Sequence, residues 1–258
     1  MNTLTVVKIG GNIIDHPAAL HAFLQDFASL GSPKILVHGG GALATGMLEK
    51  TGVPVRMHEG RRITDEETLK ICTMVYAGWI NKTIVAQLQH AGCHALGLSG
   101  ADANTVPAVK RPPAPVDFGF VGDVSAAQIN APALSLLLAH GLCPVFCAIT
   151  HDGQGGLLNT NADTMASAIA AALSKTYRTK LLFCFEKAGV LANPDDEDAV
   201  IPEITPSYFA QLKEQKIISK GMLPKLENAF AALHAGVAEV HIKHAGNLRS
   251  EKGTKVKI

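Results

Sequence analysis

The fold is decided by a strand-like run that ends at two glycines, Leu4-Thr5-Val6-Val7-Lys8-Ile9-Gly10-Gly11. The run is apolar and has the length of a strand, and helix-like sequence follows it. Where a strand leads into a helix, the unpaired N–H groups of the helix and its dipole favour an anion. Glycines at this point let a ligand approach the backbone amides. The stretch predicts the first unit of an α/β fold, with an anion site at its end.

Apolar runs of strand length alternate with helix-period segments along the rest of the chain. This alternation is typical of parallel βαβ units, and 258 residues suffice for one large domain or two closely packed lobes. The expected strands are 4–9, 34–38, 94–98, 143–149, 180–185 and 238–243. The expected helices are 17–30, 42–51, 64–89, 127–140, 161–174, 205–216 and 222–235. We therefore predict an α/β fold.

Residues 101–124 break this alternation. The prolines of Pro112-Pro113-Ala114-Pro115, together with Gly119 and Gly122, favour extended strands and turns. We expect a β-hairpin here, serving as a lid or as a wall for the substrate. A lobe boundary is expected at 174, because the following residues turn to loops and helices that carry lysine.

Composition and charge exclude several classes of protein. A hydrophobic content of 47% with 17% charged residues predicts a sizeable core and excludes a mostly disordered chain. A formal net charge of +1 provides no basic field for nucleic acid. No apolar run reaches the roughly 18–20 residues that a membrane span needs. We expect neither nucleic acid nor a membrane as a partner.

The cysteines and histidines predict neither disulfides nor a metal held by the protein alone. The 5 cysteines are odd in number, form no C-x-x-C pair and lie in apolar surroundings, as reduced cysteines do. We therefore expect a cytoplasmic protein. Among the 11 histidines there is no H-E-x-x-H, and the spacing of His241 and His244 in a strand points their rings to opposite faces.

Two glycine motifs are candidate anion sites. In the first, Lys8 precedes Gly10 and Gly11, and a lysine in a buried strand is costly to desolvate unless an anion meets it. A lysine that snorkels at a strand end is the alternative reading. The second motif is His38-Gly39-Gly40-Gly41. It matches neither the G-x-G-x-x-G of a Rossmann fold nor the G-x-x-x-x-G-K-[ST] of a P-loop, so an anion cradle of another kind is expected.

Asn159 and Asp163 lie four residues apart at the start of an alanine-rich helix. As a structural alternative, Asn161 caps this helix and Asp163 complements its dipole. That alternative leaves Asn159 without a role, so capping and function both remain open.

Three basic residues are further candidates. Lys225 stands in the first turn of a helix, an unfavourable end for a cation unless a polyanion lies between them, and Lys220 adds a second charge nearby. Arg62 precedes the long helix, and its planar fork could grip a carboxylate in bidentate fashion. A solvated arginine is the common alternative.

Five motifs in this order resemble the amino acid kinase family, and the resemblance runs from Lys8 to Val256. They are Lys-Ile-Gly-Gly at 8–11, Val-His-Gly-Gly-Gly at 37–41, Gly-Arg-Arg-Ile-Thr at 60–64, Asn-Thr-Asn-Ala-Asp at 159–163 and Gly-Met-Leu-Pro-Lys at 221–225. The resemblance implies a three-layer α/β/α sandwich around a central, mainly parallel sheet. It also implies ATP-dependent phosphorylation of the side-chain carboxylate of an N-acyl-L-glutamate, N-acetyl-L-glutamate by default, in arginine biosynthesis.

The resemblance further implies a division of labour along the chain. Residues 1–174 would bind the acylated amino acid and residues 175–258 would bind ATP, with Mg2+ arriving on the ATP. A homodimer would form through the long helix. The catalytic residues would be Lys8, Lys225 and Asp163. The substrate would be held by Gly40, Gly41, Arg62 and Asn159. ATP would be held by Lys8, Gly10, Gly11, Lys220 and Lys225.

Three other functions remain open. A kinase of the same fold could use another acceptor, namely aspartate, glutamate, carbamate or a nucleoside monophosphate. An N-succinyl substrate would bring an extra carboxylate, for which Lys110 and Arg111 on the expected hairpin are candidate partners. A non-catalytic domain that senses amino acids or nucleotides would keep the same fold without turnover. The turn at 185–190 lacks the aspartate that is usual in the family, so the resemblance does not define its nucleotide contacts.

Overall fold

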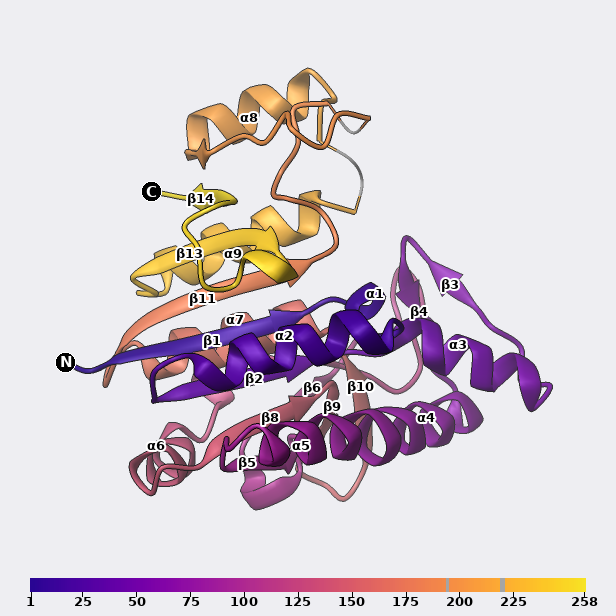
Figure 1. Ribbon diagram of the computed structural model, residues 1–258. Coiled ribbons are helices and arrows are strands. Elements are labelled where there is room, and N and C mark those ends of the chain that lie inside the picture. Colours follow the sequence, from indigo (N-terminus) through magenta and orange to yellow (C-terminus); the bar gives the residue numbers. More distant parts are fainter. Residues whose placement is uncertain (194, 219–220) are drawn as a thin grey trace.

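The computed structural model describes residues 1–193, 195–218 and 221–258. Its main strands are β1 (Thr3–Ile9), β2 (Lys34–His38), β5 (Ala95–Leu98), β8 (Cys143–Cys147), β11 (Arg178–Phe185), β12 (Glu203–Ile204), β13 (Glu239–His244) and β14 (Thr254–Val256). Within the described residues they form one sheet of eight strands in the order β12-β14-β13-β11-β1-β2-β8-β5 (Figure 1). All neighbours in this sheet are parallel except β13 and β14. The strands expected from the sequence are all present.

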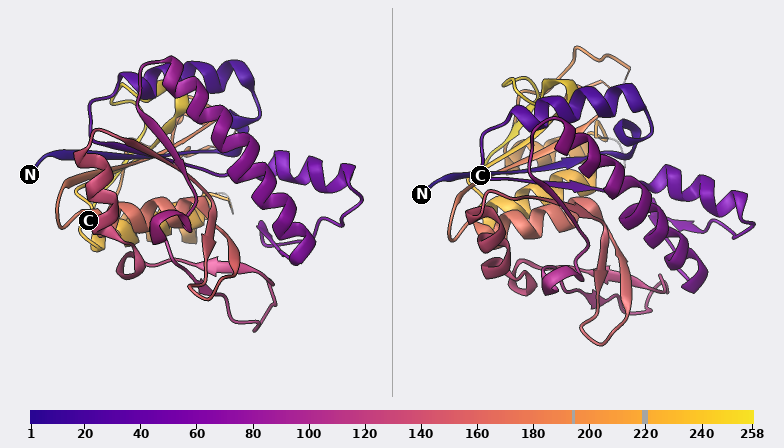
Figure 2. Two further views of the ribbon diagram at one scale, coloured as in Figure 1. Left: turned by 90° about the horizontal axis from the view of Figure 1, so that it is seen from below. Right: turned by 60° about the horizontal axis from the view of Figure 1, so that its bottom comes forward.

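Helices cover both faces of this sheet (Figure 2). One layer contains α2 (Pro17–Ser29) and α5 (Asn81–His90), and the other contains α7 (Ala162–Leu173) and α9 (Leu223–His234). Helix α7 is buried along nearly its whole length, because its many alanines let it pack closely against both the sheet and α9. The three-layer α/β/α sandwich implied by the resemblance is confirmed.

The remaining helices lie around this frame. They are α1 (Gly11–Ile14), α3 (Gly41–Lys50), α6 (Ala131–Ala139) and α8 (Pro206–Glu214), with the 3-10 turns η2 (Asp102–Asn104), η3 (Ala126–Gln128) and η4 (Ala245–Asn247). Helix α8 lies at the end of the molecule where β12 and β14 form the sheet edge (Figure 1). The two termini lie on the same side, opposite the carboxyl ends of β1 and β2 (Figure 1).

The long helix expected over 64–89 is interrupted by a wider turn that the sequence did not predict. It consists of α4 (Glu66–Thr73), a π-helical segment η1 (Met74–Ile80) and α5. The Asp65 side chain caps its start by accepting the Thr68 N–H at 2.9 Å. A π-helical turn inserts an extra residue into a helix and occurs frequently at functional sites.

The segment 101–124 contains an antiparallel pair, β6 (Val109–Lys110) and β7 (Val121–Asp123). This pair belongs to a small sheet of order β6-β7-β10-β9, completed by β9 (Ile149–His151) and β10 (Leu157–Thr160). A two-stranded ribbon, β3 (Met57–His58) and β4 (Arg61–Arg62), precedes the long helix. The role of 101–124 as a lid and the division into two lobes at 174 stay predictions.

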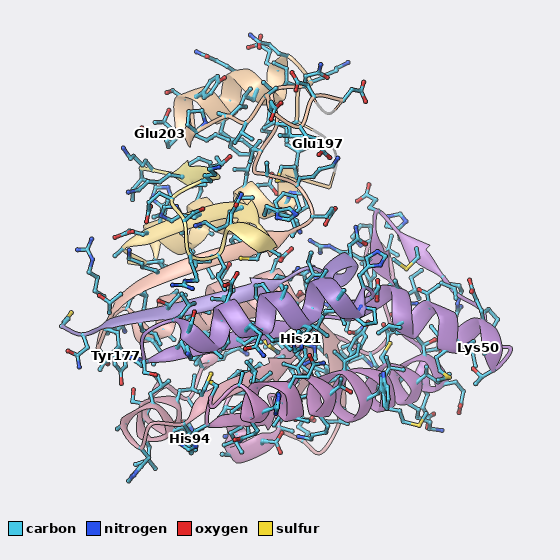
Figure 3. All side chains as sticks on the ribbon, viewed as in Figure 1. His21, Lys50, His94, Tyr177, Glu197 and Glu203 are labelled. Atoms are coloured by element: carbon cyan, nitrogen blue, oxygen red, sulfur yellow. The ribbon has the colours of Figure 1, made fainter. Side chains whose placement is uncertain are left out.

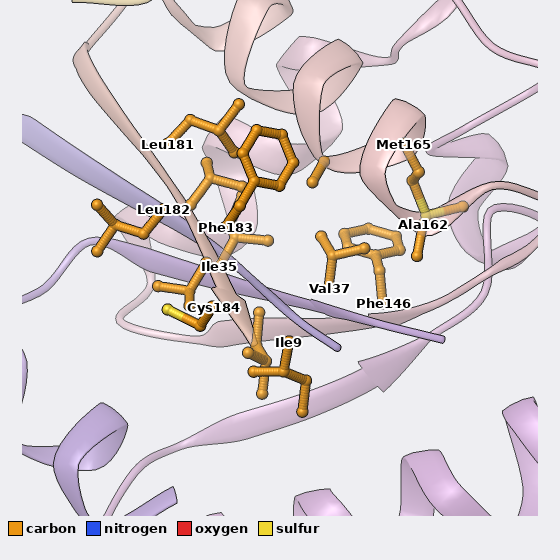
Figure 4. Close-up of a cluster of buried hydrophobic side chains, with 14 of the residues drawn as sticks. Ile9, Ile35, Val37, Phe146, Ala162, Met165, Leu181, Leu182, Phe183 and Cys184 are labelled. Carbon is orange, nitrogen blue, oxygen red and sulfur yellow. The ribbon is translucent and has the colours of Figure 1, made fainter. Parts of the chain in front are cut away.

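The core lies between the main sheet and its helices. Side chains of β1, β2, β8 and β11 meet the start of α7, where Phe146, Met165 and Phe183 pack together with the aliphatic residues around them (Figure 4). Charged side chains such as Lys50, Glu197 and Glu203 lie at the outside (Figure 3). Among the described residues, no helix has the length and apolar character needed to cross a bilayer.

Candidate active site

The candidate residues gather where the carboxyl ends of β1 and β2 meet the start of α7. Strand β1 pairs with β2 and with β11, and this places the loops that follow Ile9 and His38 side by side. Because parallel strands leave the sheet at the same edge, segments far apart in the sequence converge here. The result is a site with charged groups on one side and glycine backbone on the other.

Two lysines converge on a single carboxylate. Asp163 Oδ1 lies 2.9 Å from Lys8 Nζ, and Asp163 Oδ2 accepts a hydrogen bond from Lys225 Nζ at 2.9 Å. Lys8 and Asp163 are each 9% exposed. Burial would raise the pKa of Asp163, but the ammonium groups of Lys8 and Lys225 outweigh it and lower this pKa to about 2. The arrangement carries two positive charges and one negative charge, and therefore favours a further anion.

The first glycine loop follows β1. The Gly10 N–H donates to the Cys184 carbonyl at 2.8 Å, so this amide is engaged within the protein. A Cβ at Gly10 would lie 3.3 Å from Phe185 Cβ, whereas a Cβ at Gly11 would meet nothing within 4 Å. Gly11 is thus the residue of this pair whose amide can face a phosphate, while Gly10 lets the chain pass close to β11.

The second glycine loop follows β2 and begins α3. Gly40 has φ +147°, and a Cβ there would lie 2.1 Å from Ile80 Cδ1 and 3.1 Å from Tyr76 Cδ1. Only glycine fits a position that combines this backbone with this contact. Gly41 starts α3, and a Cβ there would meet nothing within 4 Å. The π-helical segment therefore packs directly against the bare backbone of Gly40.

Arg62 lies beside the second loop and is incompletely partnered. Its Nη2 donates to the Gly41 carbonyl at 2.9 Å and to Thr45 Oγ1 at 2.7 Å. The residue is 9% exposed, and among the described residues its Nη1 finds no hydrogen-bond acceptor. A buried guanidinium nitrogen without an acceptor is costly, and a carboxylate of a ligand would complete its hydrogen bonding.

Asn159 is tied to the same region through Thr64. Its Nδ2 donates to Thr64 Oγ1 at 3.1 Å, and Thr64 Oγ1 donates to the Arg62 carbonyl at 3.2 Å. Asn161, in contrast, caps α7 by accepting the Thr164 N–H at 3.0 Å. The capping alternative therefore describes Asn161, while Asn159 and Asp163 face other partners. Lys220 lies outside the described residues.

A hollow in the C-terminal half lies next to the start of α9. It has a volume of about 90 Å3 and is lined by Lys187, Gly189, Val190, Leu191, Ile217, Ile218 and Met222. Met222 precedes α9, the helix that carries Lys225 in its first turn. The lining is mostly apolar, and the hollow is smaller than the roughly 300–1,000 Å3 of a typical ligand pocket.

Sequence reasoning missed two parts of the surroundings. His38 and Asn81 form a buried hydrogen-bonded pair behind the second loop, and the π-helical segment brings Tyr76 and Ile80 against Gly40. A histidine at the end of a buried strand does signal a need for a partner. The partner could not be identified, because nothing in the local sequence singles out Asn81. Among the residues that the structure describes, no cluster of three metal-binding side chains occurs.

Comparisons with family models, sequences and solved structures all point to one protein family. A model described as the amino acid kinase family matches residues 3–244. An acetylglutamate kinase of Bacteroides thetaiotaomicron is 51% identical over 254 residues, covering 98% of both chains. An acetylglutamate kinase of Cytophaga hutchinsonii is 52% identical over 249 residues, covering 96% of this chain and 94% of its own. A solved structure of a Streptococcus mutans protein has a TM-score of 0.83 at 28% identity, covering 98% of both chains.

Proposed function

Because the chain belongs to the amino acid kinase family, we infer that it is a kinase that phosphorylates the side-chain carboxylate of N-acetyl-L-glutamate. The observation that carries this inference is the similarity to acetylglutamate kinases, at about 50% identity along nearly the whole chain. The donor is ATP, and the product is an acyl phosphate that feeds arginine biosynthesis.

The reaction needs charge compensation rather than a base. The acceptor carboxylate is already ionised at neutral pH, so no proton has to be removed. One carboxylate oxygen attacks the γ-phosphorus of ATP, the bond from that phosphorus to the β–γ bridging oxygen breaks, and ADP leaves with the electron pair. A site for this step consists of cations and amides that balance charge along the line of transfer.

Lys8 and Lys225 are the proposed catalytic cations. In their present positions both ammonium groups contact Asp163, which holds two like charges close to one another. A phosphoryl group that enters between them would find both cations oriented at no further cost in ordering. Lys8 would act from β1 and Lys225 from the start of α9, one on each side of the migrating group.

The acceptor and the nucleotide are assigned to different ends of this line. Arg62, whose Nη1 has no acceptor among the described residues, and Asn159 would hold the α-carboxylate of the acceptor. Gly40 and Gly41 would donate amides to its side-chain carboxylate and to the phosphoryl oxygens. ATP would extend from Gly11 over 175–258. In this scheme residues 1–174 bind the acceptor.

Magnesium would be held by ATP rather than by the protein. Asp163, the carboxylate of the site, is already paired with both lysines and has little charge to offer a metal. Mg2+ prefers phosphate oxygens and water in such sites, and it would supply further neutralisation of the β- and γ-phosphates when bound.

We also propose a cytoplasmic homodimer. Four apolar side chains on α3 and η1 are exposed next to one another: Leu43 at 37%, Met47 at 42%, Met74 at 62% and Trp79 at 70%. An apolar groove of this kind is typical of an interface, and the isologous contact of two long helices would cover it. The 5 free cysteines agree with a reducing compartment.

Two alternative functions, an N-succinylglutamate kinase and a sensing domain, can be distinguished from N-acetylglutamate kinase activity. For an N-succinyl acceptor, the candidate cations are engaged elsewhere: Lys110 Nζ lies 4.5 Å from the Phe120 ring centre, and Arg111 pairs with Asp123 and stacks on Phe118. No observation therefore favours the extra carboxylate. A sensing domain would bind ligands without releasing ADP.

The test is an ADP-release assay with N-acetyl-L-glutamate, N-succinyl-L-glutamate, L-glutamate, L-aspartate and carbamate as acceptors. Hydroxylamine traps an acyl phosphate as a hydroxamate and so identifies the product. We expect ADP and hydroxamate in equal amounts with N-acetyl-L-glutamate. Thermal stabilisation by the acceptor without any ADP would identify a sensor, and faster turnover with the succinyl acceptor would reassign the substrate.

A further inference from the structure

The proposed function gives no role to the buried histidine that precedes the second glycine loop. His38 is the last residue of β2, immediately before the second glycine loop, and it is 0% exposed. Its Nδ1 lies 2.8 Å from the Gly39 carbonyl oxygen, and its Nε2 lies 3.0 Å from Asn81 Nδ2. Both ring nitrogens are therefore partnered within the protein. Neither is available to bind substrate, so a direct role in the chemistry is excluded.

The partners of the ring fix its tautomer. Asn81 Nδ2 also lies 2.9 Å from the Val145 carbonyl oxygen, which can only accept a hydrogen bond, so this atom is the amide nitrogen and a donor. His38 Nε2 must then accept. The Gly39 carbonyl can likewise only accept, so His38 Nδ1 must carry the proton. Two independent contacts thus assign the same neutral ring, protonated on Nδ1.

This tautomer determines the orientation of the next peptide. In a trans peptide the C=O and the following N–H point in opposite directions. The Gly39 carbonyl points at the buried His38 ring, so the Gly40 N–H must point away from it. Among the described residues, no acceptor is found for the Gly40 N–H. An amide fixed in this way and left without a partner is suited to an anionic oxygen.

The same loop is held from its other side by the long helix. Ile80 and Tyr76 pack against Gly40, and Asn81, the next residue after Ile80, reaches His38. A normal α-helix turns about 100° per residue, so neighbouring residues face different ways. The wider π-helical turn just before Asn81 changes this register. The helix therefore contacts both the backbone of the loop and the ring that orients it.

We propose that His38 is a positioning residue for phosphoryl transfer, held in its Nδ1–H tautomer by Asn81 so that the Gly40 amide faces the transferred phosphoryl group. The role rests on the proposed function. It predicts an effect on turnover rather than on the affinity for either substrate, because the amide is needed most where charge develops on the phosphoryl oxygens.

A matched pair of variants tests this role. In His38→Asn the side-chain Nδ2 lies near the former ring Nδ1 and can still donate to the Gly39 carbonyl. In His38→Gln the end of the side chain lies near the former Nε2, so the contact to Asn81 can be kept but the donor to Gly39 is lost. We expect kcat to fall about 10²-fold in His38→Gln and no more than about fivefold in His38→Asn, the range set by the loss of one oriented donor. The KM values for ATP and acceptor should change less than about threefold in both.

A control separates positioning from general support of the core. His241 is buried in β13, well removed from the loop, and His241→Gln should leave kcat unchanged while lowering stability. Urea unfolding corrects every rate for the folded fraction. Equal kcat values in His38→Asn and His38→Gln, whether both normal or both reduced, would overturn the proposal.

A second measurement does not depend on turnover. Nitrogen-15 NMR of histidine-labelled protein at neutral pH identifies the protonated ring nitrogen of His38, and we expect Nδ1. A ring protonated on Nε2 would overturn the proposal even in an active enzyme. Conversely, if no acceptor is phosphorylated while Nδ1 is protonated, the proposed function fails and the orientation of the Gly39–Gly40 peptide stands.

Discussion

The two glycine loops lie side by side after neighbouring strands, yet they are held by different forces. The loop of Gly10 and Gly11 is fixed by the backbone bond from Gly10 to Cys184 and lies next to the Lys8–Asp163–Lys225 group. The loop of Gly40 is fixed by side chains of the long helix and by His38. The first region is dominated by charge, and the second by shape and hydrogen-bond direction.

This difference indicates how such a site divides its tasks. Charge acts over several ångströms and tolerates small displacements, so it suits the neutralisation of a migrating phosphoryl group. An amide acts only along its own N–H direction, so its peptide must be held rigidly. The two loops should therefore respond differently to the loss of a charged side chain, to an added Cβ atom and to a change of pH.

The largest effect is expected from removal of a cation at the first loop. Lys8→Ala or Lys225→Ala should lower kcat by about 10²–10³-fold, because one charge contact at the transferred group is lost. Circular dichroism should report an intact fold. Lys70→Ala is the control, since Lys70 is exposed and pairs with Glu66 and Glu67 on its own helix. Near-normal turnover in either active-site variant would show that the first loop does not act through the charge of its lysines.

The next effect concerns shape. Gly40→Ala should lower the free energy of unfolding by about 3 kcal/mol or more, from an unfavourable φ and from contact with Ile80. Gly11→Ala should cost less than about 1 kcal/mol, because its Cβ meets nothing within 4 Å. Urea denaturation of both variants measures the difference. Equal losses would contradict the view that only the second loop is held by packing.

The two loops should also titrate in separate pH ranges. Burial lowers the pKa of His38 from 6.5 to about 4. The hydrogen bond to Gly39 raises this pKa and the charge of Lys82 lowers it, but burial is the largest cause. As the pH decreases, His38 takes up a proton near pH 6.5 in the unfolded chain but only near pH 4 in the folded protein. The free energy of unfolding should therefore fall by up to about 3 kcal/mol between pH 6.5 and 4. The contribution of Asp163, whose pKa is lowered from 3.8 to about 2, should be lost only between those two values.

Unfolding at pH 7, 6, 5 and 4 measures the first window. His241 also has a lowered pKa, caused mainly by burial, so it contributes a slope of its own in this range. The comparison of interest is therefore wild type against His38→Asn, which lacks the titrating ring. Identical slopes in the two proteins would show that His38 is not held neutral.

The sequence predicted the frame because burial on both faces leaves a clear record. Strands that are covered by helices on each side read as continuous apolar runs, and the expected strands were all present. The strands that were missed, β10, β12 and β14 among them, are two to four residues long and are defined by their neighbours rather than by their own pattern. The π-helical segment was missed for a similar reason, since its packing against Gly40 is tertiary.

The candidate site could be predicted only in part. Lys8 and Lys225 were singled out because each is an unusual cation at a strand end or a helix start, whereas Asp163 also fits the helix dipole and was linked to them only through the family resemblance. That the Gly10 amide would be engaged by Cys184 could not be read from either segment. The pairing of His38 with Asn81 joins residues 43 positions apart, and no local pattern encodes it.

A smaller effect is expected from Arg62→Lys, which sharpens the assignment of the second loop to the acceptor. Arg62 uses Nη2 for Gly41 and Thr45, so a ligand carboxylate would meet the remaining Nη1. A lysine cannot make both sets of contacts, and the KM for N-acetyl-L-glutamate should rise about tenfold with little change for ATP. Arg61→Lys, its exposed neighbour in β4, is the control and should leave both values unchanged. If the KM for ATP rose instead, the second loop would face the nucleotide, and the assignment of the two loops would have to be exchanged.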